Sequence, residues 1–105
     1  MADDTYRDFV LDQLAPLAGA LECRKMFGGC GLSLGGSFFG ILYRGRLYFR
    51  ADPASRAEYE KRGMRPFRPN ARQTLRSYFE VPVDVVEDAD QLVSWARRAA
   101  RATTY

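Results

Sequence analysis

The side chains that could carry out covalent or acid–base chemistry are two cysteines and 13 carboxylates, and the chain has no histidine. The absence of histidine excludes the common Cys–His and Ser–His catalytic pairs and imidazole ligation of metals. Cys23 and Cys30 form no C-x-x-C motif, and two thiolates alone do not complete a tetrahedral zinc site. The carboxylates show no spacing typical of an acid/base pair. The sequence therefore predicts a protein that is not an enzyme and that binds no cofactor or metal.

Two features leave other chemistry open. We interpret both cysteines as reduced, partly buried thiols, since cytosolic proteins rarely keep disulfides. A small-molecule binder or an enzyme that uses Cys30 or a carboxylate is one alternative to a non-enzymatic protein. Residues 28–31, Gly-Gly-Cys-Gly, lack the G-K-[ST] ending of a phosphate-binding loop, and no predicted helix follows them. We interpret them as a bulge or a close backbone approach where the chain enters a sheet.

Side chains suited to binding a macromolecule lie on one face of a predicted sheet. Gly35-Gly36 and Arg44-Gly45 predict two-residue turns that join three strands within residues 24–52. Counting outward from these turns predicts a helix-covered apolar face, made of Ser33, Phe38, Gly40, Leu42, Leu47, Phe49 and Ala51. The opposite face holds Cys30, Leu32 and Leu34 together with the candidate interaction residues Phe39, Ile41, Tyr43, Arg46, Tyr48 and Arg50. No predicted helix is left to cover this second face.

Aromatic and arginine side chains on a sheet face have three interpretations. Tyrosine and arginine are enriched at protein interfaces, aromatic rings can stack on bases, and cross-strand packing alone also explains the tyrosines. A second group of arginines follows in an extended segment. We expect a solvated loop there, with a groove for DNA as the alternative; the basic residues are Arg62, Arg65, Arg68, Arg72 and Arg76.

Helices before and after these strands would position the face. Helical periodicity predicts a first helix over Thr5–Leu17, which ends or kinks at Pro16. Asp52 as N-cap, Pro53 at the first position and Gly63 after the end predict a second helix over Ala54–Arg62.

The second half continues with extended chain and a last helix. Pro66 and Pro69 disfavour helix after Gly63, and residues 74–81 read as a strand. Asp88 as N-cap, with Gln91 three residues later, predicts a final helix whose apolar stripe includes Trp95. The order α-β-β-β-α-β-β-α predicts an α+β fold of two layers, with an antiparallel sheet of about five strands.

Length and composition fit one globular domain over residues 1–105. Apolar residues make up 47% of the chain, and the net charge of +3 is far below that of a nucleic-acid polycation. The acidic N-terminus has no signal-peptide core, and no apolar run is long enough to span a bilayer. We therefore expect a cytoplasmic protein that does not enter the membrane.

Four blocks of sequence, taken together, resemble the N-terminal domain of the TfoX/Sxy family of bacterial competence regulators. They are RKMFGGCGL, FFGILYRGRLYFRAD, GMRPFR, and SYFEVP followed by EDADQLVSWARRA. The resemblance implies a compact α+β domain and a role in transcription regulation of DNA uptake, through partners such as a cyclic-AMP receptor protein. It implies no catalytic residues. We expect a stand-alone copy that lacks the second domain of complete regulators.

These observations predict a regulatory, protein-binding domain. Its partner would be a transcription regulator or a second copy of the chain as a homodimer. Direct nucleic-acid binding is the alternative.

Overall fold

The computed structural model describes residues 2–26 and 28–102. Six strands form one antiparallel sheet in the order β1-β2-β3-β4-β6-β5. The elements, in chain order, are α1 (Ala2–Gln13), a 3₁₀ turn (Ala15–Leu17), β1 (Leu21–Met26), β2 (Gly29–Leu34), β3 (Ser37–Tyr43), β4 (Arg46–Arg50), α2 (Pro53–Lys61), β5 (Pro66–Asn70), β6 (Gln73–Glu80), α3 (Val83–Val86) and α4 (Ala89–Arg101). The α+β class and the antiparallel sheet are as predicted.

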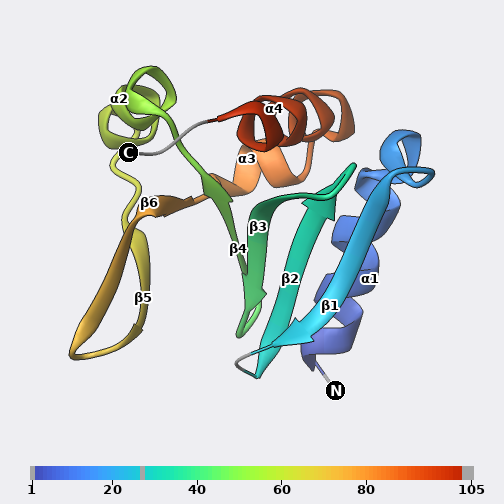
Figure 1. Cartoon of the computed structure of the whole chain (residues 1–105), viewed down its shortest axis with the longest axis horizontal. Coiled ribbons are helices and arrows are strands. Elements are labelled where there is room, and N and C mark those ends of the chain that lie inside the picture. The colour runs from blue at the N-terminus through green and yellow to red at the C-terminus, as the bar shows by residue number, and fades with distance from the viewer. Residues whose placement is uncertain (1, 27, 103–105) are drawn as a thin grey trace.

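The helices pack on one face of the sheet. Figure 1 shows α4 lying across the middle strands, α2 beside it and α1 near β1. Their buried side chains join those of the sheet in one core, which includes Val10, Leu92 and Phe49. None of the helices in the described part of the chain is long and apolar enough to cross a membrane.

The predicted helix boundaries are confirmed where capping residues mark them. The Asp52 carboxylate accepts a hydrogen bond from the Ser55 amide at 2.7 Å, and Ser55 Oγ accepts one from the Asp52 amide at 2.9 Å. The Asp88 carboxylate caps α4 by accepting hydrogen bonds from the Gln91 side-chain amide at 2.9 Å and the Gln91 backbone amide at 3.2 Å. The hydrogen bonds that the Asp52 carboxylate accepts from Ser55, and those that the Asp88 carboxylate accepts from Gln91, lower the pKa values of both aspartates. Gly63 has the positive φ of 76° expected after the end of a helix.

The chain contains two features that the sequence did not predict. β1 adds a sixth strand, and α3 forms a short turn of helix after Pro82. The predicted end of the first helix near Pro16 is present, although α1 already stops at Gln13 and Pro16 lies in the 3₁₀ turn. β1 is a polar edge strand, and residues 22–25 are all exposed, so the apolar alternation that marks a strand is missing.

One bulge changes the predicted register of the sheet. Both two-residue turns are present, with positive φ at Gly35, Gly36, Arg44 and Gly45. Ser33 pairs with Phe38 as predicted, but the next pair is Leu32 with Gly40, which leaves Phe39 as an extra residue in β3.

This bulge corrects the predicted faces. Cys30 and Leu32 lie in the helix-covered core and not on the opposite face. Phe38 lies on the opposite face, where its ring contacts that of Tyr78 with centroids 5.9 Å apart.

Candidate functional site

The face of the sheet that carries no helix is the candidate site, and we call it the open face. Paired residues share a face, and the register places Ile41 opposite Tyr48, Tyr48 opposite Glu80, and Tyr43 opposite Arg46. Four rings on this face are half-buried: Phe38, Tyr43, Tyr48 and Tyr78. Burial raises the pKa values of Tyr48 and Tyr78, so both hydroxyls stay protonated at neutral pH.

The β5–β6 hairpin covers one part of the open face. Phe67 of β5 is 1% exposed, and its ring centroid lies 4.6 Å from that of Tyr48 and 5.4 Å from that of Tyr43. Ile41 is 3% exposed on the same face. The sequence leaves no helix to cover this face, and in the structure a strand from the second half of the chain supplies a ring there instead.

A hollow remains over β1, β2 and β3. It is open to solvent and lined by small, charged and aromatic residues: Glu22, Arg24, Gly31, Ser33, Gly36 and Phe38. The hollow exists because the glycines and the serine have small side chains, and the Phe38 ring borders it on one side. Over β1 to β3 the open face is thus a shallow depression bordered by the Phe38 ring.

Two of the six predicted interaction residues have structural roles instead. Phe39 is fully buried on the helix-covered side, where its ring lies 5.4 Å from Phe49 in an edge-to-face arrangement. The bulge puts it there. Phe39 is therefore not part of an exposed surface.

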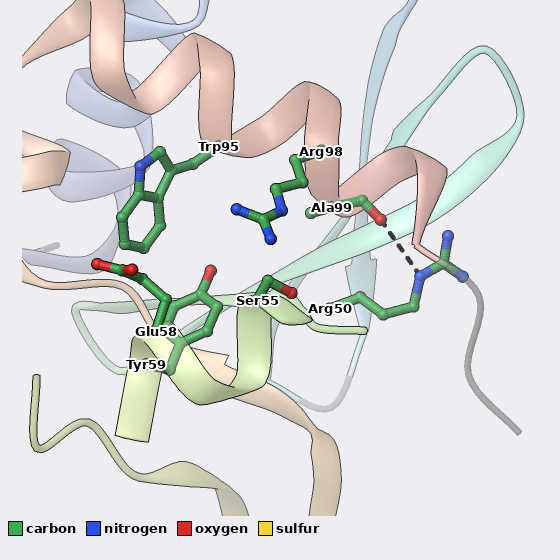
Figure 2. Close-up of a pocket in the computed structure, with 7 residues that line it drawn as sticks. All are labelled: Arg50, Ser55, Glu58, Tyr59, Trp95, Arg98 and Ala99. Carbon is green, nitrogen blue, oxygen red and sulfur yellow. Dashed lines mark hydrogen bonds between the residues drawn. The ribbon is translucent and has the colours of Figure 1, made fainter. Parts of the chain in front are cut away.

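Arg50 binds the C-terminal end of α4. Its Nη2 donates to Ser37 Oγ at 3.0 Å and to the Ala100 carbonyl oxygen at 3.2 Å, and its Nε donates to the Ala99 carbonyl oxygen at 3.4 Å (Figure 2). The last carbonyls of a helix carry the negative end of its dipole. The Ala99 carbonyl also accepts from the Ala102 amide at 3.1 Å, and the Ala100 carbonyl accepts from Ser37 Oγ at 2.8 Å. The guanidinium therefore adds a charged donor to both carbonyls, and Arg50 holds the sheet to α4.

The other four predicted residues do come together. The rings of Tyr43 and Tyr48 contact that of Phe67, and Ile41 is paired with Tyr48 across the two strands. Arg46 pairs with Glu80 at 3.1 Å beside Tyr48. The Arg46 side chain is 61% exposed, which makes this a weak surface pair. Sequence reasoning missed Phe38, Phe67 and Tyr78. A bulge and a strand pairing between residues far apart in the chain place these three rings on the open face.

A family model for the TfoX N-terminal domain matches residues 12–103. The chain belongs to this family. No curated protein matches it. The resemblance drawn from the four sequence blocks is confirmed, although Phe27 in the first block lies outside the described residues.

This TfoX N-terminal domain has a small cleft between α2 and α4. Tyr59 and Ser55 of α2 face Arg98 and Trp95 of α4 across it (Figure 2). Its cavity volume of about 20 Å³ lies far below the roughly 300 Å³ at the small end of ligand pockets. Burial strongly raises the pKa of Tyr59, which removes the phenol as a base at neutral pH.

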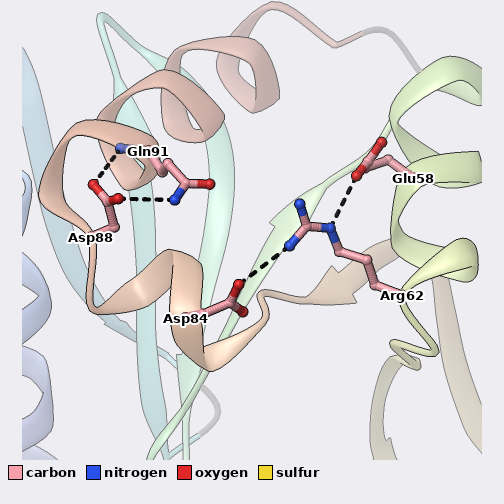
Figure 3. Close-up of polar contacts among 5 residues, drawn as sticks. All are labelled: Glu58, Arg62, Asp84, Asp88 and Gln91. Carbon is pink, nitrogen blue, oxygen red and sulfur yellow. Dashed lines mark hydrogen bonds and ion pairs between the residues drawn. The ribbon is translucent and has the colours of Figure 1, made fainter.

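Arg62 differs from the other arginines of the predicted basic segment. It pairs with Glu58 at 3.0 Å and with Asp84 at 3.5 Å (Figure 3). Its guanidinium also lies over the Trp95 ring. It therefore links α2 to α3 and α4. In contrast, the predicted basic strip lies on the β5–β6 hairpin or at its base, with every side chain exposed: Arg65, Arg68, Arg72 and Arg76.

The two cysteines are free thiols on neighbouring strands, Cys23 exposed and Cys30 buried. Desolvation, together with a hydrogen bond to Cys30, raises the pKa of Cys23 to about 11. Cys23 is therefore a thiol at neutral pH, which makes it a poor nucleophile. Among residues 2–26 and 28–102, no three Cys, Asp or Glu side chains are grouped as metal ligands.

Proposed function

We propose that this TfoX N-terminal domain is a non-enzymatic regulatory domain that binds a protein partner through its open face. The observation that carries the proposal is the set of half-buried rings on a sheet face without a helix: Phe38, Tyr43, Tyr48 and Tyr78. Aromatic rings that are already held by packing lose little conformational entropy on binding, and they dominate protein interfaces.

Family membership and the chemistry of the domain support this proposal. The depression on the open face has no convergent set of titratable groups, and the α2–α4 cleft is small. The family resemblance implies a setting in transcription, where a partner of the cyclic-AMP receptor protein type would bind. Such a partner would lay an apolar segment against Phe38 and Tyr78.

The proposal is tested by placing charge on the open face. Phe38→Lys combined with Tyr78→Lys should weaken binding to the purified cyclic-AMP receptor protein of the host about tenfold or more, the effect expected when interface hot spots are lost. Calorimetric titration measures the affinity, and circular dichroism checks the fold.

Phe9→Lys is the matched control, because Phe9 is 40% exposed on α1 and belongs to the helical layer. It should bind as the wild type does. The same variants, used for capture from host lysate, extend the test to other partners. A protein retained by the doubly substituted domain and lost from Phe9→Lys would place the contact elsewhere.

Direct nucleic-acid binding is a second candidate, favoured by the β5–β6 hairpin. The hairpin projects from the sheet at the end farthest from β1 (Figure 1), and the basic strip runs along it. In the described part of the chain, no ion pair joins the strip to a carboxylate. A basic β-ribbon of this kind fits the major groove of duplex DNA.

If the hairpin contacts phosphates, affinity for duplex DNA should fall with salt. Arg68→Gln and Arg72→Gln should each reduce the slope of log affinity against log salt by about 0.9. Arg46→Gln, a charge paired with Glu80, should leave the slope unchanged. Fluorescence anisotropy at several salt concentrations measures these slopes. No detectable binding at low salt would exclude this candidate.

A further inference from the structure

β1 is an edge strand whose outer side is free to pair. Within residues 2–26 and 28–102 it pairs only with β2, and residues 22–25 are exposed along it. Cys23 lies opposite Leu32, on the helix-covered face, and is nevertheless exposed, so α1 does not bury this position. The other edge strand, β5, contains Pro66 and Pro69, which cannot donate to a further strand. Only β1 is therefore suited to extend the sheet.

The charges on β1 select one way of pairing with a second copy. A two-fold axis perpendicular to the sheet keeps both helical layers on one side, and residues that face each other must then point to the same face. With the axis at Cys23, Glu22 of each copy faces Arg24 of the other. An axis at Glu22 or at Arg24 places two like charges opposite each other, which is destabilising.

We propose that β1 pairs antiparallel with β1 of a second copy about an axis at Cys23. The two sheets then form one continuous sheet, and the two open faces lie side by side. Charged edge residues usually discourage strand pairing, but here they are self-complementary in this register. The proposal goes beyond the proposed function, because a monomer could also bind a partner through its open face.

The contact is short, so the dimer should be in equilibrium with the monomer. β1 has six residues, and the area it buries falls short of a standard stable interface. Sedimentation velocity over a range of concentrations should show a concentration-dependent dimer. Glu22→Arg and Arg24→Glu should each weaken it about tenfold or more, because each turns two attractive pairs into repulsive ones.

Exchanging the charges at positions 22 and 24 shows whether the loss of the dimer comes from the proposed strand pairing or from an unspecific effect of the substitutions. The double variant Glu22→Arg with Arg24→Glu should recover the dimer. An equimolar mixture of the two single variants should form a heterodimer, since the changed charges again face opposite charges. Both positions are exposed, so the fold should not change. Unchanged association in the single variants, or no recovery in the mixture, would overturn the proposal.

Crosslinking tests the register. In a Cys30→Ser background and at mildly alkaline pH, which ionises part of the Cys23 thiol, a short bifunctional thiol reagent should join Cys23 of the two copies. Moving the single thiol two residues along β1, with Cys23→Ser and Lys25→Cys, should abolish most of the product. Residues 25 of the two copies would lie four positions apart along the paired strands, roughly 13 Å. A monomer at every concentration, or equal crosslinking at both positions, would contradict pairing about Cys23.

Discussion

Gly29→Ala is expected to destabilise the domain by about 3 kcal/mol or more, the upper end of what overpacking costs. Gly29 begins β2, and a Cβ on it would overlap the carbonyl oxygen of Leu42 in β3. Because the obstacle is backbone and not a flexible side chain, β2 or β3 would have to move. Urea unfolding measures the loss. The close backbone approach predicted for the Gly28–Gly31 segment is thus present at Gly29.

Gly19→Ala is the matched control for this prediction. Gly19 has no atom within 4 Å of a built Cβ and no positive φ. Alanine there should change stability by less than about 1 kcal/mol, in the stabilising direction, because it restricts the unfolded chain. Equal stability of the two variants would mean that β2 and β3 do not approach as closely at Gly29 as described.

Arg50→Met is expected to cost about 2–3 kcal/mol and to lower the melting temperature by about 10 °C or more. The substitution keeps the aliphatic stem but removes the guanidinium that binds the Ala99 and Ala100 carbonyls and Ser37. These carbonyls would then face the sheet without their charged donor, and the favourable charge at the C-terminal end of α4 would be lost. Thermal unfolding followed by circular dichroism provides the measurement.

Arg46→Met makes the same chemical change on the same strand. Arg46 pairs only at the surface with Glu80, so its loss should cost about 1 kcal/mol or less. A similar loss for both variants would show that Arg50 acts as an ordinary surface charge. This comparison also decides whether Arg50 can be used to probe binding, since a variant that loosens α4 would reduce binding indirectly.

Local sequence signals predicted the parts of the fold that depend on neighbouring residues. Asp52 with Pro53, Asp88 with Gln91, and Gly63 each set a helix boundary through hydrogen bonds or φ angles within a few residues. The turns at Gly35-Gly36 and Arg44-Gly45 were predictable for the same reason. These signals are sufficient for the α+β class and for most of the element order.

The candidate site depended on non-local features, and there the sequence was less informative. The bulge at Phe39 reverses which side chains of β2 and of the start of β3 face the helices. No residue type in the sequence marks the position of this bulge. Arg50 appeared to belong to a surface because its partners, Ala99 and Ala100, lie about 50 residues away in the sequence. Phe67 reaches the open face only because β6 pairs with β4 and β5 pairs with β6.

The open face can be tested as the contact surface by hydroxyl-radical footprinting of the domain, alone and bound to the protein partner. We expect Phe38, Tyr43 and Tyr78 to lose reactivity in the complex, while Phe9 on α1 keeps it. Protection of Phe9 with unchanged reactivity of the rings on the open face would contradict it.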